Sequence, residues 1–355
     1  MRIAIVSTWP PAKCGVAQYS RKLTIELQAL DHEVKIFAER TKELIPARPG
    51  VVRNWTRLGP IPTGPILDFR PDVLQIEHEY GIFPNAQYLW RLIDDLTPIP
   101  VVITLHTVTA APKHVGFYMG YRRAHFIAHS PAAVAILSSR GDWPAHFVHH
   151  GCSIQERLPR QEALAKLRLP DRPMVLCAGF MAPSKGHREI IEGFAQARER
   201  TPMTLVIVGE CRDGAHYTMI DNLIKEYSLD ADVVVNASFQ ADLLPYLSAA
   251  SFVVLGNWKG SPYSASGQLH DALGLGLPVL AKNAPIYQFG GEGVLLYSDP
   301  TELAALMVAL AKRPDLREHL SQSALTEARV RSWQAVAKRH IEVYEQCRNT
   351  SSAKS

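Results

Sequence analysis

Short apolar runs separated by helical patterns recur along the first half of the chain. The runs are rich in β-branched residues and lack the alternation of polar residues that marks a half-exposed strand. Strands buried on both faces have this composition, and helices between them indicate a parallel, doubly wound sheet. Seven runs have this character, at residues 2–8, 32–39, 51–55, 72–80, 101–106, 125–130 and 146–151.

The second half repeats the pattern with six runs, at residues 174–180, 204–210, 232–239, 251–257, 277–281 and 293–298. We therefore predict an α/β fold with two Rossmann-like domains, one over 1–165 and one over 170–331. Residues 156–173 are charged, bounded by prolines and without a buried strand, as expected of a hinge. A closing helix at about 332–347 has an apolar stripe that must pack on something, and residues 349–355 are expected to be disordered.

The composition is that of a globular protein, expected in the cytoplasm. A chain of 355 residues with 47% apolar residues can bury two cores. No apolar run reaches the roughly 18 residues of a membrane span, and Trp9, Pro10 and Pro11 halt the apolar start before it resembles a signal peptide. The five cysteines are scattered without a C-x-x-C pair, so we expect reduced thiols and no disulfide or zinc site.

The excess of positive charge lies in the first half. Lys and Arg outnumber Asp and Glu by 38 to 34 over the chain and by 16 to 12 within residues 1–150. This suits an anionic acceptor or an acidic membrane surface, although scatter accounts for it equally well. No run of Lys and Arg is interleaved with aromatic residues, which argues against nucleic acid. Residues 112–126 place aromatics beside Lys113, Arg122 and Arg123, as in an interfacial membrane helix or an acceptor-side helix with a solvated face.

Candidate binding residues stand where the predicted strands end, because ligands of open parallel sheets bind beyond the carboxyl ends of the strands. The first strand leads into a helix near Gly15 and Val16. Exposed amides there would hold a phosphate, and glycine lets the backbone approach closely. A plain tight turn explains the glycine as well.

Ionisable residues cluster at the end of the fourth predicted strand. Glu77, His78 and Glu79 crowd there, and burying unpaired charge is too costly for simple core filling. Strand alternation places Glu77 and Glu79 on one face and His78 on the other. With Tyr80 they are candidates for acceptor binding, and an ordinary solvated loop is the alternative. The next strand ends at His106, a candidate catalytic residue or a structural histidine.

The second half contains a candidate cationic side chain, and further along the chain a candidate anion-binding loop. Lys185 and Gly186 precede a helix, where the ammonium group would hold charge on a leaving diphosphate, although many such lysines have no role. The order GFMAPSKGH lacks the Walker pattern. Further on, small residues before a helix offer amides to an anion, and a carboxylate one turn later could bind two ribose hydroxyls. These residues are Ser264, Ser266, Gly267, Gln268 and Asp271.

Together these pieces resemble glycosyltransferase family four, which is retaining and has the GT-B fold of two Rossmann-like domains facing each other across a cleft. Each motif is weak alone, and their order and spacing are specific. They are the glycine loop at Gly15, HEYGIF at 78–83, TLH at 104–106, HHG at 149–151, GFMAPSKGHREIIEGF at 179–194, DLLPYLSAASFVVL at 242–255, ALGLGLPVLA at 272–281 and the crossover helix SWQAVAKRHIEVYEQC at 332–347.

The resemblance implies roles for the residues that match these motifs. Amides at Gly15 would meet the donor diphosphate, and His106 would reach the donor sugar or the acceptor. Lys185 would neutralise the leaving phosphate, and Asp271 would hold the ribose. The loop whose amides touch the sugar and phosphate would be Ser266 and Gly267.

The chain departs from the family's pattern at three positions. Tyr263 stands where the family has the first of two glutamates separated by seven residues, so the donor-sugar pocket is altered. Asp271 replaces the second glutamate, which shortens its reach. Phe180 stands where a basic residue is common, leaving Lys185 as the assignable cation. Tyr263 and the serines after it would supply neutral hydroxyls toward the sugar.

The resulting hypothesis is a retaining, metal-independent transferase in polysaccharide or glycoconjugate biosynthesis. It would move a hexose from a UDP- or GDP-sugar to a hydroxyl of a sugar, lipid-linked or small-molecule acceptor, with no cofactor. The D-x-D at 230–232 precedes a strand and is interpreted as a turn. Catalysis would rest on Lys185, His106 and Glu79. A GT-B nucleotide-sugar epimerase and a catalytically impaired binding or partner subunit are the alternatives.

Overall fold

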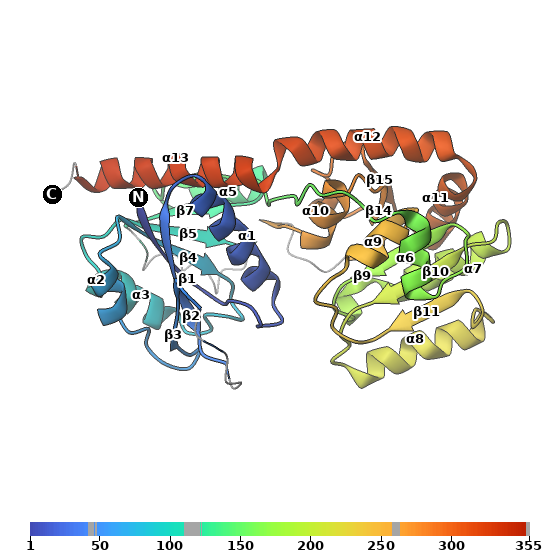
Figure 1. Ribbon diagram of the computed structural model, residues 1–355, viewed down its shortest axis with the longest axis horizontal. Helices are drawn as coiled ribbons and strands as arrows, with labels where there is room; N and C mark the ends of the chain where they lie inside the picture. Colours follow the sequence, from blue (N-terminus) through green and yellow to red (C-terminus); the bar gives the residue numbers. More distant parts are fainter. Residues whose placement is uncertain (42–45, 47, 110–120, 122, 258–262, 353–355) are drawn as a thin grey trace. The chain divides into compact units, whose positions relative to one another are not determined.

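The structure is a computed structural model that describes residues 1–355 apart from 42–45, 47, 110–120, 122, 258–262 and 353–355. The chain divides into two compact units, each with its own parallel sheet (Figure 1). The first comprises Met1–Gly151, Ser261–Ala265 and Trp333–Ser355, and the second comprises Cys152–Gly260 and Ser266–Ser332. The predicted α/β class with two Rossmann-like domains is thereby confirmed.

The first unit is built on a parallel sheet whose strands are the seven runs predicted from the first half of the sequence. The strand order reverses at the first strand of the chain, the place where ligands bind in such sheets. From edge to edge the strands are β3 (Val51–Trp55), β2 (Glu33–Glu39), β1 (Arg2–Ser7), β4 (Val73–His78), β5 (Val101–Leu105), β7 (Ala124–Ala128) and β8 (Ala145–Phe147).

Helices cover both faces of this sheet. They are α1 (Gly15–Ala29), α2 (Gly64–Phe69), α3 (Ala86–Asp95), α5 (Pro131–Ser138) and α13 (Trp333–Ser352). Successive residues of a strand face opposite sides, so Ile3 and Ile5 pack with α1 and α13, whereas Ala4 and Val6 pack with α2, α3 and α5 (Figure 1). Burial on both faces explains the continuous apolar sequence of the strands.

The last helix packs on the first unit. In α13, Trp333, Val336 and Tyr344 are buried in one cluster with α1 and β1, as the apolar stripe of that segment indicates. The helix runs to Ser352, so residues 349–352 are helical and not the disordered tail that we expected. Near its end the Thr350 hydroxyl lies 3.1 Å from Nε2 of His125, which ties the final turn to the sheet.

The second unit has a parallel sheet that contains the six runs predicted from the second half. In order the strands are β11 (Val233–Asn236), β10 (Thr204–Val208), β9 (Met174–Ala178), β12 (Phe252–Leu255), β14 (Val279–Lys282) and β15 (Val294–Tyr297). Helices α7 (His187–Arg198), α8 (Gly214–Glu226) and α11 (Pro300–Lys312) cover one face. Helices α6 (Arg160–Leu167), α9 (Leu244–Ala249) and α10 (Gly267–Gly274) cover the other, and α12 (Pro314–Val330) contributes to both clusters.

The boundary between the units lies at 151/152, earlier than the position near 165 set from the sequence. The reason is that α6 packs on the second unit, where Ala163 and Leu164 are buried with α9 and α10. The Arg157 guanidinium also donates to the backbone carbonyls of Leu275 and Gly276. The whole segment 156–173, expected to be a hinge, therefore lies in the second unit.

Two short strands were not predicted. β6 (Thr107–Val108) follows β5, and β13 (Tyr263–Ser264) pairs with it in antiparallel fashion, so that Tyr263 is opposite Val108 and Ser264 is opposite Thr107. This pairing assigns the backbone of Tyr263 and Ser264 to the first unit, although the residues on either side of their segment belong to the second.

Close packing explains why the HHG motif ends in a glycine. A Cβ added at Gly151 would overlap the ring of Trp333, which is 5% exposed. We expect Gly151→Ala to lower the free energy of unfolding by about 1–3 kcal/mol, because a close-packed core tolerates added volume poorly. Denaturation by urea, followed by circular dichroism, measures this change. The control is Gly64→Ala, where an added Cβ meets nothing within 4 Å; equal losses in both variants would contradict the packing account.

Candidate functional site

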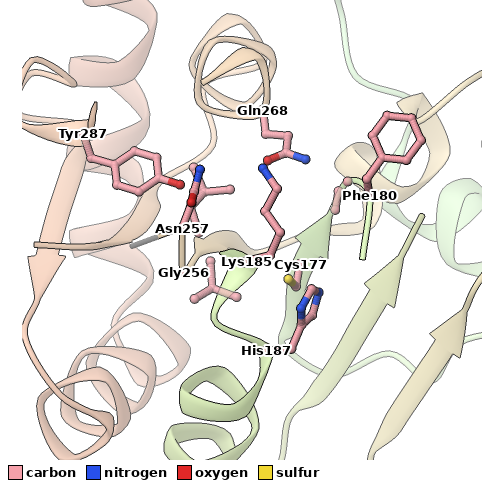
Figure 2. A pocket seen from close by; sticks show the side chains of 12 residues that line it. Cys177, Phe180, Lys185, His187, Gly256, Asn257, Gln268 and Tyr287 are labelled. Carbon is pink, nitrogen blue, oxygen red and sulfur yellow. The ribbon is translucent and has the colours of Figure 1, made fainter. Parts of the chain in front are cut away.

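The second unit forms a pocket where β9 and β12 end. Its lining includes the two loops that follow these strands and the start of α10 (Figure 2). Gly179 has φ of +122° and Gly186 has φ of +68°, a region that favours glycine. A Cβ at Gly179 would overlap the Gln268 amide, and one at Gly186 would overlap the Gly256 carbonyl. Both glycines therefore allow the backbone and Gln268 to converge on the pocket.

Lys185 supplies the positive charge of this pocket. It ends the 3₁₀ turn Pro183–Lys185 and is half-buried, and Figure 2 shows its side chain extending toward Gln268. Burial lowers the pKa of Lys185, and the nearby Cys177 thiol partly offsets this effect. Among the residues that the structure describes, no carboxylate lies within 4 Å of its ammonium group. A half-buried ammonium without a protein counter-ion fits an anionic ligand.

The start of α10 lies beside this lysine. Ser266 is the N-cap, and its hydroxyl accepts a hydrogen bond from the Leu269 amide at 3.3 Å. Ser266 is 8% exposed, and its hydroxyl caps the helix. It is therefore not one of the neutral hydroxyls that we expected to face the sugar. Gly267 is exposed, and the half-buried Asp271 lies one turn into the helix. The structure thus brings Lys185, Gln268 and the amides before Asp271 into one unit.

The backbones of Tyr263 and Ser264, predicted to bind the donor with these residues, are assigned to the first unit. Their backbones pair with β6 of the first unit, next to His106. No local signal in the sequence indicates this pairing, because its two partners are about 155 residues apart. A donor-binding role for them stays a prediction.

In the first unit, α1 begins at Gly15 as predicted. Its N-cap Cys14 makes no side-chain hydrogen bond to the helix, and a Cβ at Gly15 would meet nothing within 4 Å. The first amides of the helix are therefore not capped by the side chain of Cys14, which leaves them available to an anion. Val16 is 8% exposed and its side chain packs in the core, which leaves its backbone amide as the group that could meet a donor phosphate.

His78 is part of the core. It is fully buried, its ring stacks on Phe83 with a centroid distance of 5.8 Å, and Tyr80 packs edge-on at 5.2 Å. Burial, and then the charge of His106, lower the pKa of His78 to about 3, which keeps the ring neutral. The expectation that His78 binds an acceptor is therefore wrong, because its side chain does not reach the surface of the unit. Strand alternation correctly predicted that His78 and Glu77 point to opposite faces of the sheet.

The carboxylates of the motif face the end of β5. Oε2 of Glu77 lies 2.9 Å from Nε2 of His106, and Oε2 of Glu79 accepts a hydrogen bond from the Thr107 hydroxyl at 2.8 Å. Glu77 is fully buried, so it cannot touch an acceptor directly, and the expected contact is corrected. Glu79 and Tyr80 are half-buried and stay candidates for acceptor binding.

Aromatic and imidazole rings surround His106 in this unit. Tyr19 packs edge-on against it at 4.7 Å, and His129 lies at 5.3 Å. His150 and His340 pack around Tyr19, whose hydroxyl lies 3.3 Å from Nε2 of His340. Of these neighbours, His150 and His340 lie in the HHG motif and the crossover helix of the family resemblance, whereas Tyr19 and His129 were not predicted. His129 could have been found, because it follows β7 just as His106 follows β5.

An interfacial membrane helix or an acceptor-side helix with a solvated face was expected at residues 112–126. Most of this segment lies outside the described residues, and its last part, 124–126, belongs to β7. Among the helices that the structure does describe, none is both long enough and apolar enough to cross a bilayer.

Known proteins share both sequence and fold with this chain. Residues 159–326 match the family model described as Glycosyl transferases group 1. A D-inositol 3-phosphate glycosyltransferase of Nocardioides sp. is 26% identical over 223 residues, which cover 57% of this chain and 48% of that protein. The match thus spans about half the length of this curated relative.

Several solved structures superpose on the whole chain. Sucrose-phosphate synthase from Thermosynechococcus elongatus does so with a TM-score of 0.74 over 98% of both chains, at 23% identity. HepE from Anabaena, solved with UDP-glucose, gives 0.76 over 98% of this chain and 100% of that chain, at 17% identity. WaaG, a glycosyltransferase involved in lipopolysaccharide biosynthesis, gives 0.68 over 96% and 99%, at 13% identity. These similarities establish the fold.

Two buried histidines generate a pH dependence of stability. Burial, and then the charges of His216 and Lys185, lower the pKa of His187 to about 4, and that of His78 is about 3. The unfolded chain takes up these protons near pH 6.5, whereas the folded protein resists them. We therefore expect the free energy of unfolding to fall as the pH drops from about 6.5 toward 4.

His78→Phe, which keeps a ring on Phe83, should flatten this fall in urea titrations at several pH values. The exposed His319→Gln is the matched control and should leave the slope unchanged. A slope in His78→Phe equal to that of the wild type would contradict the assignment of His78 to the core.

The match to the family model covers the pocket around Lys185 and the start of α10, and the solved structures give the architecture of the whole chain. Residues 159–326, which lie in the second unit, are therefore similar to glycosyl transferases group 1, and the chain has a fold similar to that of GT-B glycosyltransferases such as sucrose-phosphate synthase and WaaG.

Proposed function

We propose that this protein is a retaining glycosyltransferase that moves a hexose from a nucleoside diphosphate sugar to an acceptor hydroxyl without a metal ion. The observation that carries the proposal is Lys185, a half-buried cation with no carboxylate of a described residue within 4 Å. It lies beside the helix start in the matched domain. A diphosphate is the anion that such a donor would bring.

The leaving diphosphate is the group that Lys185 stabilises in this proposal. Negative charge grows on the phosphate as the glycosidic bond breaks, and a preorganised cation lowers the energy of that state more than that of the bound donor. Amides at Gly267 and Gln268 add dipoles of the same sign at the start of α10. Asp271 is one turn further on, where its carboxylate would accept hydrogen bonds from the ribose hydroxyls.

The first unit supplies the groups near the acceptor in this proposal. His106 reaches the reacting sugar or the attacking hydroxyl, Glu79 and Tyr80 orient the acceptor, and the amides at the start of α1 help hold the donor diphosphate. Retention follows if the leaving phosphate takes the acceptor's proton on the same face of the sugar. The proton then moves from the acceptor oxygen to the phosphate oxygen as the new glycosidic bond forms, which leaves charge and atoms balanced.

UDP is the nucleotide that the comparisons favour, because HepE was solved with UDP-glucose. The relatives serve different acceptors, as the names D-inositol 3-phosphate glycosyltransferase and sucrose-phosphate synthase show for those proteins. WaaG is involved in lipopolysaccharide biosynthesis. We place this chain in polysaccharide or glycoconjugate biosynthesis, with a sugar, lipid-linked or small-molecule acceptor.

The role of Lys185 is tested by nucleotide affinity. We expect Lys185→Met to weaken binding of UDP, or of GDP if that is the nucleotide the wild type prefers, by about 10-fold or more, because a charge-assisted contact is worth roughly 1.5–3 kcal/mol. Binding of the nucleoside monophosphate should change less. Isothermal titration calorimetry measures both affinities.

The matched control is Lys282→Met in the same unit. The Lys282 ammonium group is already paired with Glu189 at 2.8 Å, so its loss should leave nucleotide affinity unchanged. Lys185→Arg, which keeps the charge, should retain most of the affinity. Equal affinity in wild type and Lys185→Met would contradict a diphosphate site at this lysine.

A further inference from the structure

The carboxylate of Glu77 is buried directly behind His106. The parallel register pairs Glu77 with Thr104 and His78 with Leu105, so the chain leaving β5 brings His106 next to the end of β4. Glu77 has no exposed surface, and its Oε2 lies 2.9 Å from Nε2 of His106. The imidazole is 11% exposed. His106 therefore stands between a buried carboxylate and the surface of the first unit.

The second oxygen of this carboxylate has a neutral partner. Nε2 of Gln75 donates to Oε1 of Glu77 at 3.2 Å and to the Thr104 hydroxyl at 2.7 Å, and both Gln75 and Thr104 are fully buried. Within the described parts of the chain, no Lys or Arg nitrogen lies within 4 Å of Glu77. Since a buried carboxylate without a donor or counter-ion costs several kcal/mol, the hydrogen bond from His106 is its main compensation.

A histidine and a tyrosine that pack beside this pair are neutral. His340 donates from Nδ1 to the Val336 carbonyl at 2.9 Å, so its neutral ring accepts from the Tyr19 hydroxyl at Nε2. Burial lowers the pKa of His340 and raises that of Tyr19. The titratable groups that face Glu77 and His106 come from α1, β4, the end of β7 and α13. They are Tyr19, His78, Glu79, His129, His340 and Tyr344.

These contacts fix both the proton and the orientation of the His106 ring. Nε2 can donate to the carboxylate only if it carries a proton, which leaves Nδ1 as the other nitrogen of the ring. Nδ1 makes no hydrogen bond to a residue that the structure describes. Tyr19 on the ring edge and His129 restrict rotation, so the ring cannot exchange the two nitrogens without breaking the bond to Glu77.

We propose that Glu77 is a positioning residue that holds a proton on Nε2 of His106 and so presents Nδ1 to a hydroxyl of the donor sugar or acceptor. This inference rests on the proposed function for the identity of that hydroxyl. A neutral ring accepts a hydrogen bond at Nδ1 from a hydroxyl, and the carboxylate stabilises the ring when it becomes charged. Glu77 thus acts through His106, in contrast to Glu79, whose contacts are the Thr107 hydroxyl and the Tyr80 amide.

The test uses nitrogen-15 NMR of the histidine rings in the full chain, with assignment by His106→Gln. In the wild type we expect the His106 signal of a protonated Nε2 at every pH in the stable range. Glu77→Gln should populate the form protonated on Nδ1, because an amide can donate to Nε2. Glu79→Gln is the matched control and should leave the His106 signals unchanged. A wild-type His106 protonated on Nδ1 alone would overturn the proposal.

Kinetics provide the second readout. Glu77→Gln should lower kcat by about 10- to 100-fold with little change in KM for the nucleotide sugar, since a misplaced proton affects the chemical step more than donor binding. Glu77→Asp, which keeps the charge, should recover part of the loss. An unchanged kcat in a Glu77→Gln variant that has lost the Nε2 proton would overturn the proposal.

The two readouts separate this inference from the proposed function. If the wild type transfers no sugar but shows the Nε2 proton, and Glu77→Gln loses it, the positioning stands and the transferase proposal fails. If Glu77→Gln does not fold, the wild-type NMR signal alone decides, because a proton on Nδ1 contradicts the geometry whatever the activity.

Discussion

The free-energy cost of burying a charge beneath the helices that cover each sheet determines where the ionisable side chains of this protein lie. Each sheet is parallel and packed with helices on both sides, so a polar or charged group in the middle of a strand costs free energy unless it is hydrogen-bonded or paired. Ionisable side chains therefore collect where strands end. Glu77 and His106 do so in the first unit, and Lys185 follows the end of β9 in the second.

The two units differ in how their buried or half-buried charge is compensated. In the first, the negative charge of Glu77 is enclosed and compensated within the protein by His106 and Gln75. In the second, the positive charge of Lys185 is half-buried and has no carboxylate near it in the described structure. The contact with Glu77 holds the His106 ring in place. The Lys185 ammonium group has no such partner among the described residues and can bind an anionic ligand. This contrast is why we assign positioning to one site and anion binding to the other.

Much of this could be predicted from the sequence, because the signals were local. Continuous apolar runs gave all the strands of the two large sheets, and Lys185 with Gly186 marked a loop before a helix. The errors arose where the answer depends on distant segments. Alternation showed that Glu77 and His78 face opposite ways, but both are buried because helices cover both faces of the sheet. The pairing of β13 with β6, and the packing of α6, likewise depend on contacts that no local pattern encodes.

The central claim is that this chain transfers a sugar and releases the nucleotide. Proton NMR of the protein mixed with UDP- and GDP-sugars and a panel of hydroxyl acceptors tests it most directly. The account predicts that nucleoside diphosphate accumulates and that the new glycosidic bond has the anomeric configuration of the donor. A sugar that stays attached to its nucleotide while another ring carbon changes configuration would contradict the account, as would tight nucleotide binding without transfer from any donor.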